Sequence, residues 1–205
     1  MSNVTLDLIK SRVSANCFDE TATISDAEIA ELIDYARQAP SSFNFQNWRF
    51  IAVRESSAKE RLKAVAYGQP KVSQAAVTFI VIGLLNPQAR LADALAPSLK
   101  EGILDQATVD TWVGMATGMY GGNAVLQRDE AIRSGSLAAM TLMLAAEAKG
   151  FVSGAMIGFD VAGVSKEFSL GVDEVPVMLL TVGRAAAGNW PRKPRFPISE
   201  ILKVI

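Results

Sequence analysis

Residues 40–50 read PSSFNFQNWRF, from Pro40 to Phe50, and connect a helical pattern to an apolar strand. The helical pattern runs from Ser25 to Gln38, and the strand from Trp48 to Val53. The connection holds two hydroxyl groups and three amides after a proline turn, so polar groups gather at one end of a predicted sheet. Such a cluster can hold a ligand, although Pro-Ser-Ser-x-Asn is also an ordinary helix exit followed by a turn.

A capping-box pattern marks the start of the helix before this connection. Ser25 is the candidate N-cap, and Glu28 stands at the spacing that lets its carboxylate reach back to the cap. Apolar residues then recur at helical spacing and form a stripe that we expect to be buried, made of Ile29, Leu32, Ile33 and Ala36. Upstream of it, the pattern predicts a short helix at Val4–Lys10 and a loop at Ser11–Thr23.

Further strands and helices are predicted downstream, which favours an α+β domain. The strands are expected at Ala75–Leu85, Val152–Ile157 and Pro176–Val182. A helix is expected from Ser56 or Ser57 to about Ala66, and a second, short one from the cap Asp160 toward Phe168. The tail at Asn189–Pro197 contains three prolines and predicts irregular structure, and Ile198–Ile205 is expected to be an extended apolar end.

A long helix is predicted at Asp129–Lys149 and is ended by Gly150. It is apolar on most of its circumference, so it has to be covered on nearly all sides. A domain of this size has difficulty covering such a helix alone, and we infer that a second copy of the chain covers part of it. The preceding residues, 87–122, are a helix-biased insertion, rich in Ala, Met and Gly, that could form a lid.

The composition excludes several classes of function. The chain has 205 residues, half of them hydrophobic, which suits one domain with a substantial core. Twenty basic and 21 acidic residues give a net charge of −1 with no basic block, so neither nucleic acid nor an anionic membrane is an expected partner. The first ten residues do not resemble a signal peptide, and no apolar run reaches the ~20 residues of a membrane span. We therefore expect a soluble, cytoplasmic protein.

The chain has no histidine and a single cysteine, Cys17. This excludes internal disulfides, histidine metal ligands, and nucleophiles activated by histidine, and we expect no metal site. Cys17 is interpreted as a packing residue, because nothing nearby except Arg12 would favour its thiolate. An enzyme of this composition has to use carboxylates, lysine or a cofactor that brings its own reactivity.

Cations and hydroxyls occur in three separated segments that suit a phosphate. They are Arg12 with Ser14, the stretch Ser41–Asn44, and Lys193 with Arg195. Guanidinium, ammonium and hydroxyl groups are the natural partners of a phosphate monoester. Prolines beside Lys193 and Arg195 stiffen that segment and reduce the entropy lost on binding. Taken alone, these residues are better interpreted as scattered solvated cations, which is what most Lys and Arg residues are.

Five motifs, in this order and spacing, resemble the nitroreductase family over nearly the whole chain. They are Arg12-Val13-Ser14-Ala15-Asn16-Cys17-Phe18, Pro40-Ser41-Ser42-Phe43-Asn44-Phe45-Gln46-Asn47-Trp48, Gln69-Pro70-Lys71, Gly154-Ala155-Met156-Ile157-Gly158-Phe159 and Lys193-Pro194-Arg195-Phe196-Pro197. The resemblance implies a single domain at 1–205 with an α/β/α sandwich, in which helices flank a central, mostly antiparallel sheet. It also implies a C-terminal segment that extends to a partner subunit, and an FMN-dependent homodimer with the flavin at the interface.

The resemblance assigns the flavin contacts by position. The phosphate and ribityl end would be bound by Arg12, Ser14, Lys193 and Arg195. The other subunit would line the ribityl chain and ring edge with Ser41, Ser42, Phe43 and, less directly, Asn44. Lys71 and Gln69 would face the pyrimidine edge, where positive charge stabilises the reduced anion. Asn16 and Met156 would lie near the ring, with the backbone N–H groups of Ile157 and Gly158 directed at N5 and O4.

Two positions depart from the family pattern. Asn16 stands where many relatives carry Lys or Arg, so one positive charge near the ring is missing, and a lower flavin potential is expected. Ile157 stands where one branch carries Glu, which makes the surroundings of the ring more apolar. The substrates of the family branch that carries Glu therefore do not indicate the substrate of this protein.

The implied chemistry is a ping-pong hydride transfer from NADH or NADPH to nitroaromatics, quinones or similar electron-poor acceptors. Flavin N5 carries the hydride, so no catalytic side chain is required. Gly118–Gly122 lacks the preceding strand of a Rossmann fingerprint. An acceptor pocket would be walled by Phe43, Trp112, Met115, Met119 and Tyr120, although such a stripe is more often core. The alternatives are an FMN-storage or sensing protein, or a flavin reductase, dehalogenase or enone reductase of the same fold.

Overall fold

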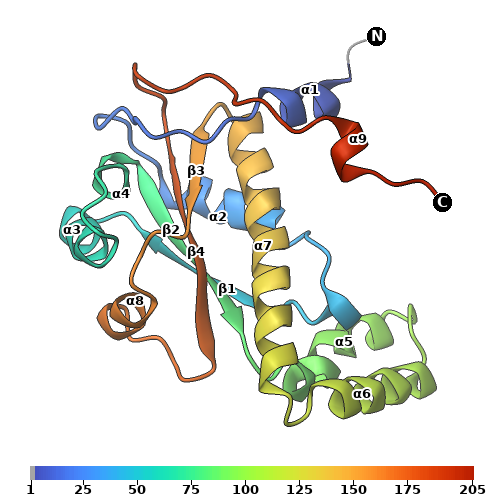
Figure 1. Ribbon diagram of the computed structural model, residues 1–205. Coiled ribbons are helices and arrows are strands. Elements are labelled where there is room, and N and C mark those ends of the chain that lie inside the picture. Colours follow the sequence, from blue (N-terminus) through green and yellow to red (C-terminus); the bar gives the residue numbers. More distant parts are fainter. Residues whose placement is uncertain (1–2) are drawn as a thin grey trace.

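Four strands form one antiparallel sheet at the centre of the fold (Figure 1). The computed structural model describes residues 3–205. Met1 and Ser2, which belong to the segment that does not resemble a signal peptide, lie outside that range. The strands are β1 (Trp48–Val53), β2 (Val77–Leu84), β3 (Val152–Met156) and β4 (Glu174–Gly183), in the spatial order β1-β2-β4-β3. The predicted strands are confirmed, with boundaries that differ by one or two residues.

Strand β2 is central because its side chains are apolar on both faces. Val77, Phe79 and Val81 belong to one core cluster, whereas Ile80 and Ile82 belong to another on the opposite face. This alternation follows from the two-residue period of a strand. All of β2 except Leu84 is buried, so helices have to cover both faces of the sheet.

Helices cover the two faces and produce the three layers that the resemblance implied. Helices α2 (Asp26–Ala36) and α7 (Ala124–Ala148) pack on one face, and α3 (Ser56–Val65), α4 (Lys71–Gln74) and α8 (Val161–Glu167) pack on the other (Figure 1). The capping box of α2 is confirmed, and Asp160 caps α8 as expected. Helix α2 ends at Ala36, before the predicted Gln38, and the α+β class is confirmed.

The long helix α7 begins at Ala124, earlier than the predicted Asp129. Asn123 caps it by accepting a hydrogen bond from Leu126 N–H at 3.1 Å. Its end near Gly150 is confirmed, since Gly150 adopts a φ of 74° that other residues disfavour. One side of α7 packs on the sheet, but Leu137 and Met140 on another side remain 40% and 37% exposed.

The insertion between β2 and α7 is helical. It contains the short helix η2 (Pro87–Arg90) followed by α5 (Leu91–Lys100) and α6 (Gln106–Tyr120). These helices share a core of their own, formed by Phe45, Leu91, Leu95, Val109, Ala116 and Tyr120. The helical bias of residues 87–122 is confirmed, and their role as a lid stays a prediction.

The two ends of the chain lie side by side. Helix α1 (Val4–Ser11) is next to the C-terminal tail, which runs over the same edge of the molecule and then leads away from it (Figure 1). Residues 186–197 contain no helix or strand, as expected. The expectation of a fully extended end was wrong, because Ile198–Ile201 form a single helical turn, α9. The tail has no neighbouring strand to pair with, so its N–H groups bond locally, as Leu202 N–H does to Ile198 O at 2.9 Å.

No helix within residues 3–205 combines the length and the apolar character that crossing a membrane would require.

Candidate functional site

The N-terminal segment after α1 lies directly against β3. Ala15 N–H donates to Ser153 O at 2.9 Å, and Ser14 forms an isolated parallel bridge with the same residue. Gly154 makes this approach possible, because a Cβ there would lie 2.4 Å from the carbonyl oxygen of Ala15 and 2.8 Å from Thr181 Oγ1. The absence of a side chain at Gly154 therefore brings the first motif of the sequence to the edge of the sheet.

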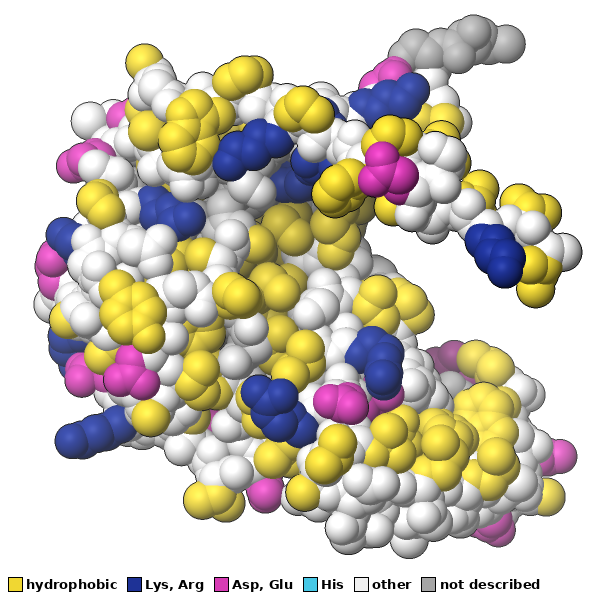
Figure 2. Space-filling view, in the orientation of Figure 1, with side chains coloured by type: hydrophobic (Ala, Val, Ile, Leu, Met, Phe, Trp, Pro, Cys, Tyr) yellow, Lys and Arg dark blue, Asp and Glu magenta, His cyan; other side chains and the backbone are white. Residues whose placement is uncertain are grey.

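A cavity of about 260 Å³ is enclosed where this segment meets the C-terminal tail and the start of α4. Its lining combines residues from opposite ends of the sequence: Arg12, Val13, Ser14, Asn16, Lys71, Ala155, Trp190, Pro191, Arg192, Lys193 and Arg195. Five of these side chains are cationic, and among the described residues the lining includes no acidic one. Figure 2 shows Lys and Arg side chains gathered on the upper part of the molecule, where the tail crosses α1.

Two of the cations have charge that nothing in the described structure neutralises. Arg12 Nη1 is buried and has no hydrogen-bond partner. Lys71 Nζ lies 3.4 Å from Asn16 Oδ1, a neutral acceptor, and burial lowers the pKa of the Lys71 ammonium below its ordinary value. A buried donor without a partner costs free energy, so the cavity is suited to an anion with several acceptor oxygens.

The polar connection Ser41–Asn44 lies at the other end of the sheet. It leads into β1, where Trp48 pairs with Gly83 at the far end of β2, whereas the cavity is lined by Ala155 of β3, the strand at the opposite edge of the sheet. Within it, η1 (Ser42–Asn44) holds Phe43 and Asn44 at φ values of 51° and 60°, and Ser41 Oγ accepts a hydrogen bond from Gln46 N–H at 2.9 Å. A single subunit therefore does not bring these residues to the cationic cavity.

The remaining predicted flavin contacts lie just beyond β3. Gln69 Nε2 donates to Gly158 O at 2.6 Å, which places the loop before α4 against the end of β3. Ile157 is 80% exposed, whereas the side chain of Met156 packs into the core on the α3–α8 face. Only the backbone of Met156 is thus available to a ligand on that edge.

The residues predicted to wall an acceptor pocket are split between core and surface. Tyr120 is buried and donates to Glu130 Oε2 at 3.1 Å, and Trp112 stacks edge-on against Phe43 with ring centroids 6.2 Å apart. Met115 and Met119 are exposed on α6. Only these two methionines present an open apolar surface, and the pocket itself stays a prediction.

The sequence analysis assigned no role to Asn189, Trp190 or Arg192. Trp190 and Arg192 line the cavity, and Asn189 binds the backbone of Asn16 and Cys17. An irregular tail has no periodicity from which the direction of a side chain can be read. The one available signal was the density of polar and aromatic residues in Asn189–Arg195.

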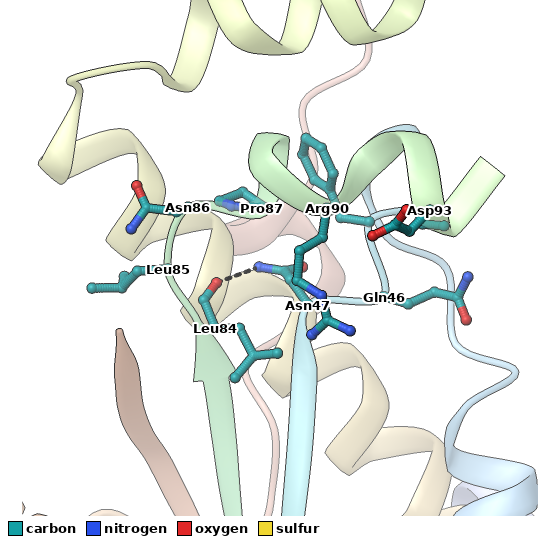
Figure 3. Close-up of a pocket in the computed structure, with 10 residues that line it drawn as sticks. Gln46, Asn47, Leu84, Leu85, Asn86, Pro87, Arg90 and Asp93 are labelled. Carbon is teal, nitrogen blue, oxygen red and sulfur yellow. Dashed lines mark hydrogen bonds between the residues drawn. The ribbon is translucent and has the colours of Figure 1, made fainter. Parts of the chain in front are cut away.

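A second cavity, of about 280 Å³, lies between the end of β2 and α5 (Figure 3). Asn47 Nδ2 donates to Leu84 O at 3.1 Å at its base, and Arg90 and Asp93 stand on its rim. Arg90 and Asp93 carry opposite charges, so together they add no net charge to this cavity. This cavity therefore lacks the excess positive charge that distinguishes the first one.

Comparisons with known proteins agree with this geometry. A family model described as the nitroreductase family matches residues 9–184. The chain belongs to the nitroreductase family. Among its relatives, YodC of Bacillus subtilis (strain 168), provisionally named an NAD(P)H nitroreductase, is 34% identical over 96% of both chains. The family resemblance inferred from the five motifs is confirmed.

Solved structures of the nitroreductase family superpose on the whole chain. A provisionally assigned nitroreductase from Exiguobacterium sibiricum 255-15, solved in complex with FMN, has a TM-score of 0.90 and 27% identity, and the match covers 100% of this chain and 99% of that one. The gut-bacterial enone reductase CLA-ER has a TM-score of 0.86 and 25% identity, with coverage of 100% and 99%. The fold is thus shared by proteins that are named for different acceptors.

Proposed function

We propose that the protein is an FMN-dependent oxidoreductase that uses NADH or NADPH to reduce nitroaromatics, quinones or similar electron-poor acceptors. The observation that carries the proposal is a cavity lined by five cations, one of which, Arg12, has a buried Nη1 without a hydrogen-bond partner. A phosphate monoester has the charge and the acceptor oxygens that such a site requires. A structural neighbour with FMN supports this choice of ligand.

The residues around the cavity fit separate parts of FMN. Arg12 and Ser14 would hold the phosphate together with Lys193 and Arg195, which extend from the tail. Arg195 Nη1 now donates to Lys193 O at 3.0 Å, and Lys193 Nζ lies 4.7 Å from the centre of the Trp190 ring. These local contacts are weak enough for a phosphate to replace them. Lys71, Asn16 and Gln69, with the backbone of Met156–Gly158, would face the ring.

A second copy of the chain would complete the site. Ser41, Ser42, Phe43 and Asn44 lie at the opposite end of the sheet, so they reach a flavin in this cavity only from a partner subunit. Figure 2 shows a hollow face between the C-terminal segment above and the α5–α6 unit below, with hydrophobic side chains along it. Exposed apolar residues of α6, α7 and α9 support a homodimer on this face.

FMN would supply the redox chemistry, accepting a hydride from the nicotinamide and passing it to the acceptor in a separate half-reaction. The chain's own residues bind and orient it, and Lys71 adds positive charge that favours the reduced anion. The CLA-ER structure favours one other acceptor class, activated alkenes of enones. A cytoplasmic location, where NADH and NADPH are supplied, is part of the proposal.

The proposal is tested by the colour and reactivity of the purified protein. Protein purified without added flavin should be yellow, and the chromophore released on denaturation should be FMN. Anaerobic NADH or NADPH should bleach the flavin band rapidly, and a quinone, nitroaromatic or enone should restore it. A yellow protein that is not bleached would be a storage or sensing protein, and a colourless protein that ignores added FMN would contradict the proposal.

Replacing Leu137 with Glu should separate the proposed dimer. Leu137 is 40% exposed on α7, the helix that we expect a partner subunit to cover, and a carboxylate there would be buried unpaired in a dimer. The variant should be monomeric by light scattering and should lose FMN, because Ser41–Asn44 are then absent from the site. Val172→Glu, in the exposed loop between α8 and β4, is the control and should stay dimeric. A dimeric Leu137→Glu variant with normal FMN affinity would place the interface elsewhere.

FMN affinity should fall at alkaline pH through Lys71. Burial lowers the pKa of Lys71 in the free protein, whereas the phosphate and the ring oxygens favour its ammonium form. Binding is therefore strongest below the lowered pKa and weakens as the pH rises through it. Titrations from neutral to alkaline pH should show this loss in the wild type and in Lys63→Met, a surface control. Lys71→Met should bind more weakly and without the alkaline loss, and an unchanged pH profile in Lys71→Met would contradict the assignment.

A further inference from the structure

Asn189 joins the C-terminal tail to the N-terminal segment. Its Oδ1 accepts hydrogen bonds from Asn16 N–H at 2.7 Å and from Cys17 N–H at 3.0 Å. Its Nδ2 donates to Cys17 O at 2.7 Å and to Ala186 O at 3.0 Å. Three of these four bonds hold backbone groups that are 172 or 173 positions away in the sequence. Asn189 carries no charge and does not line the cavity.

Arg192 makes a second connection, three residues further along the tail. Its Nη1 donates to Lys10 O at 2.7 Å, to Arg12 O at 2.9 Å and to Ile9 O at 3.3 Å. These carbonyls belong to the end of α1, where the backbone has no helical partner and the helix dipole is negative. The guanidinium therefore satisfies the exposed end of α1 and at the same time ties the tail to Arg12.

The two connections surround the phosphate-binding residues. Lys193 follows Arg192 directly, and Arg195 lies two residues beyond, while Arg12 supplies one of the carbonyls that Arg192 binds. Residues 191–205 are exposed, so packing contributes little to the place of the tail in one subunit. Hydrogen bonds from Asn189 and Arg192 thus determine where Lys193 and Arg195 stand relative to Arg12.

We propose that Asn189 and Arg192 are positioning residues, here called the tail clamp, that assemble the cationic cavity before its ligand arrives. The inference rests on the proposed FMN function. A tail that is already docked loses little conformational freedom when Lys193 and Arg195 contact a phosphate. A tail that is not docked would have to become ordered when FMN binds. The entropy lost in that step would lower the affinity for FMN. FMN binding and tail docking are therefore coupled.

The test compares Asn189→Ala and Arg192→Ala with Arg184→Ala. Arg184 is a matched control because its Nη1 also donates to helix-end carbonyls, those of Lys149 and Gly150, but it does not line the cavity. FMN and riboflavin dissociation constants are measured for the dimeric protein. Both clamp variants should bind FMN about tenfold or more weakly, as expected when a preorganised segment is released. Riboflavin, which lacks the phosphate, and Arg184→Ala should show little change.

The fluorescence of Trp190 gives a readout that does not depend on flavin. Trp190 lies between the clamp residues, lines the cavity and is 62% exposed, so release of the tail should remove the remaining shielding of its ring, shift its emission to the red and increase quenching by acrylamide. Subtracting a Trp190→Phe spectrum isolates this signal from Trp48 and Trp112. In the flavin-free protein, Asn189→Ala and Arg192→Ala should show the shift, and Arg192→Lys should restore part of the wild-type signal.

The possible outcomes distinguish a failure of the tail clamp from a failure of the proposed FMN function. Unchanged FMN affinity in Asn189→Ala, or a loss confined to Arg192→Ala, would show that charge rather than position matters and would overturn the proposal. Equal losses for FMN and riboflavin would also overturn it. If the wild-type protein binds no FMN while the Trp190 signal responds to both substitutions, the clamp stands and the proposed function fails.

Discussion

Replacing Arg12 with Ala is expected to weaken FMN binding about ten- to a hundredfold, since a charge-assisted hydrogen bond contributes about 1.5–3 kcal/mol and each 1.4 kcal/mol is about tenfold. Arg12 Nη1 is buried without a partner in the free protein, so its desolvation has already occurred before the ligand binds. A phosphate that contacts the Arg12 guanidinium would supply the acceptor that this group lacks. Equilibrium titration with FMN, followed by flavin fluorescence, measures the loss.

The same substitution should not destabilise the flavin-free protein. Removing a buried donor that lacks a partner relieves a cost in the free state, so the melting temperature without FMN should stay level or rise while the FMN-induced increase shrinks. Riboflavin affinity should change little. Arg37→Ala is the control, because Arg37 lies on the surface of α2 and pairs with Asp34. Equal loss of FMN and riboflavin affinity, or none, would remove Arg12 from the phosphate site.

Replacing Gly154 with Ala is expected to destabilise the fold by about 1–3 kcal/mol, the usual cost of an extra carbon in a filled space. The new Cβ would lie 2.4 Å from Ala15 O and 2.8 Å from Thr181 Oγ1, and the first of these contacts is with backbone that cannot rotate away. The N-terminal segment would have to leave β3 and would carry Ser14 and Asn16 with it. Loss of FMN affinity should therefore accompany the loss of stability.

Gly118→Ala provides the matched control for this prediction. Gly118 lies within α6, and a Cβ there would meet nothing within 4 Å. Alanine is favoured over glycine in helices by about 0.8–1.0 kcal/mol, so the control should be neutral or stabilising. Denaturant unfolding of both variants gives the comparison. A Gly154→Ala protein as stable as the wild type would show that the close approach of Ala15 to β3 is not required.

Strong local patterns predicted most of the elements. The capping box at Ser25 and Glu28, the apolar run that became β2 and the Gly150 terminus each specify an element through neighbouring residues alone. The start of α7 was missed because Gln127 looks like a polar surface residue in the sequence, as does Glu130 within the predicted part of the helix. In the structure both are buried, and Gln127 Nε2 donates to Tyr120 O at 2.7 Å while Glu130 accepts from Ser134 Oγ at 3.1 Å. Buried polar residues interrupt the apolar periodicity from which a helix is predicted.

The sequence by itself determined the chemistry available to this protein. Its lack of histidine and its single cysteine exclude several kinds of catalysis, its separated cations and hydroxyls suit a phosphate, and five ordered motifs identify the family. Only the tertiary structure decided that Arg12 and Lys71 share one cavity with Lys193 and Arg195, and that Ser41–Asn44 lie at the opposite end of the sheet. The physical reason is that this convergence depends on hydrogen bonds between opposite ends of the chain, through Asn189 and Arg192, and on the missing side chain of Gly154. Contacts of that range have no period or spacing along the sequence from which they can be read.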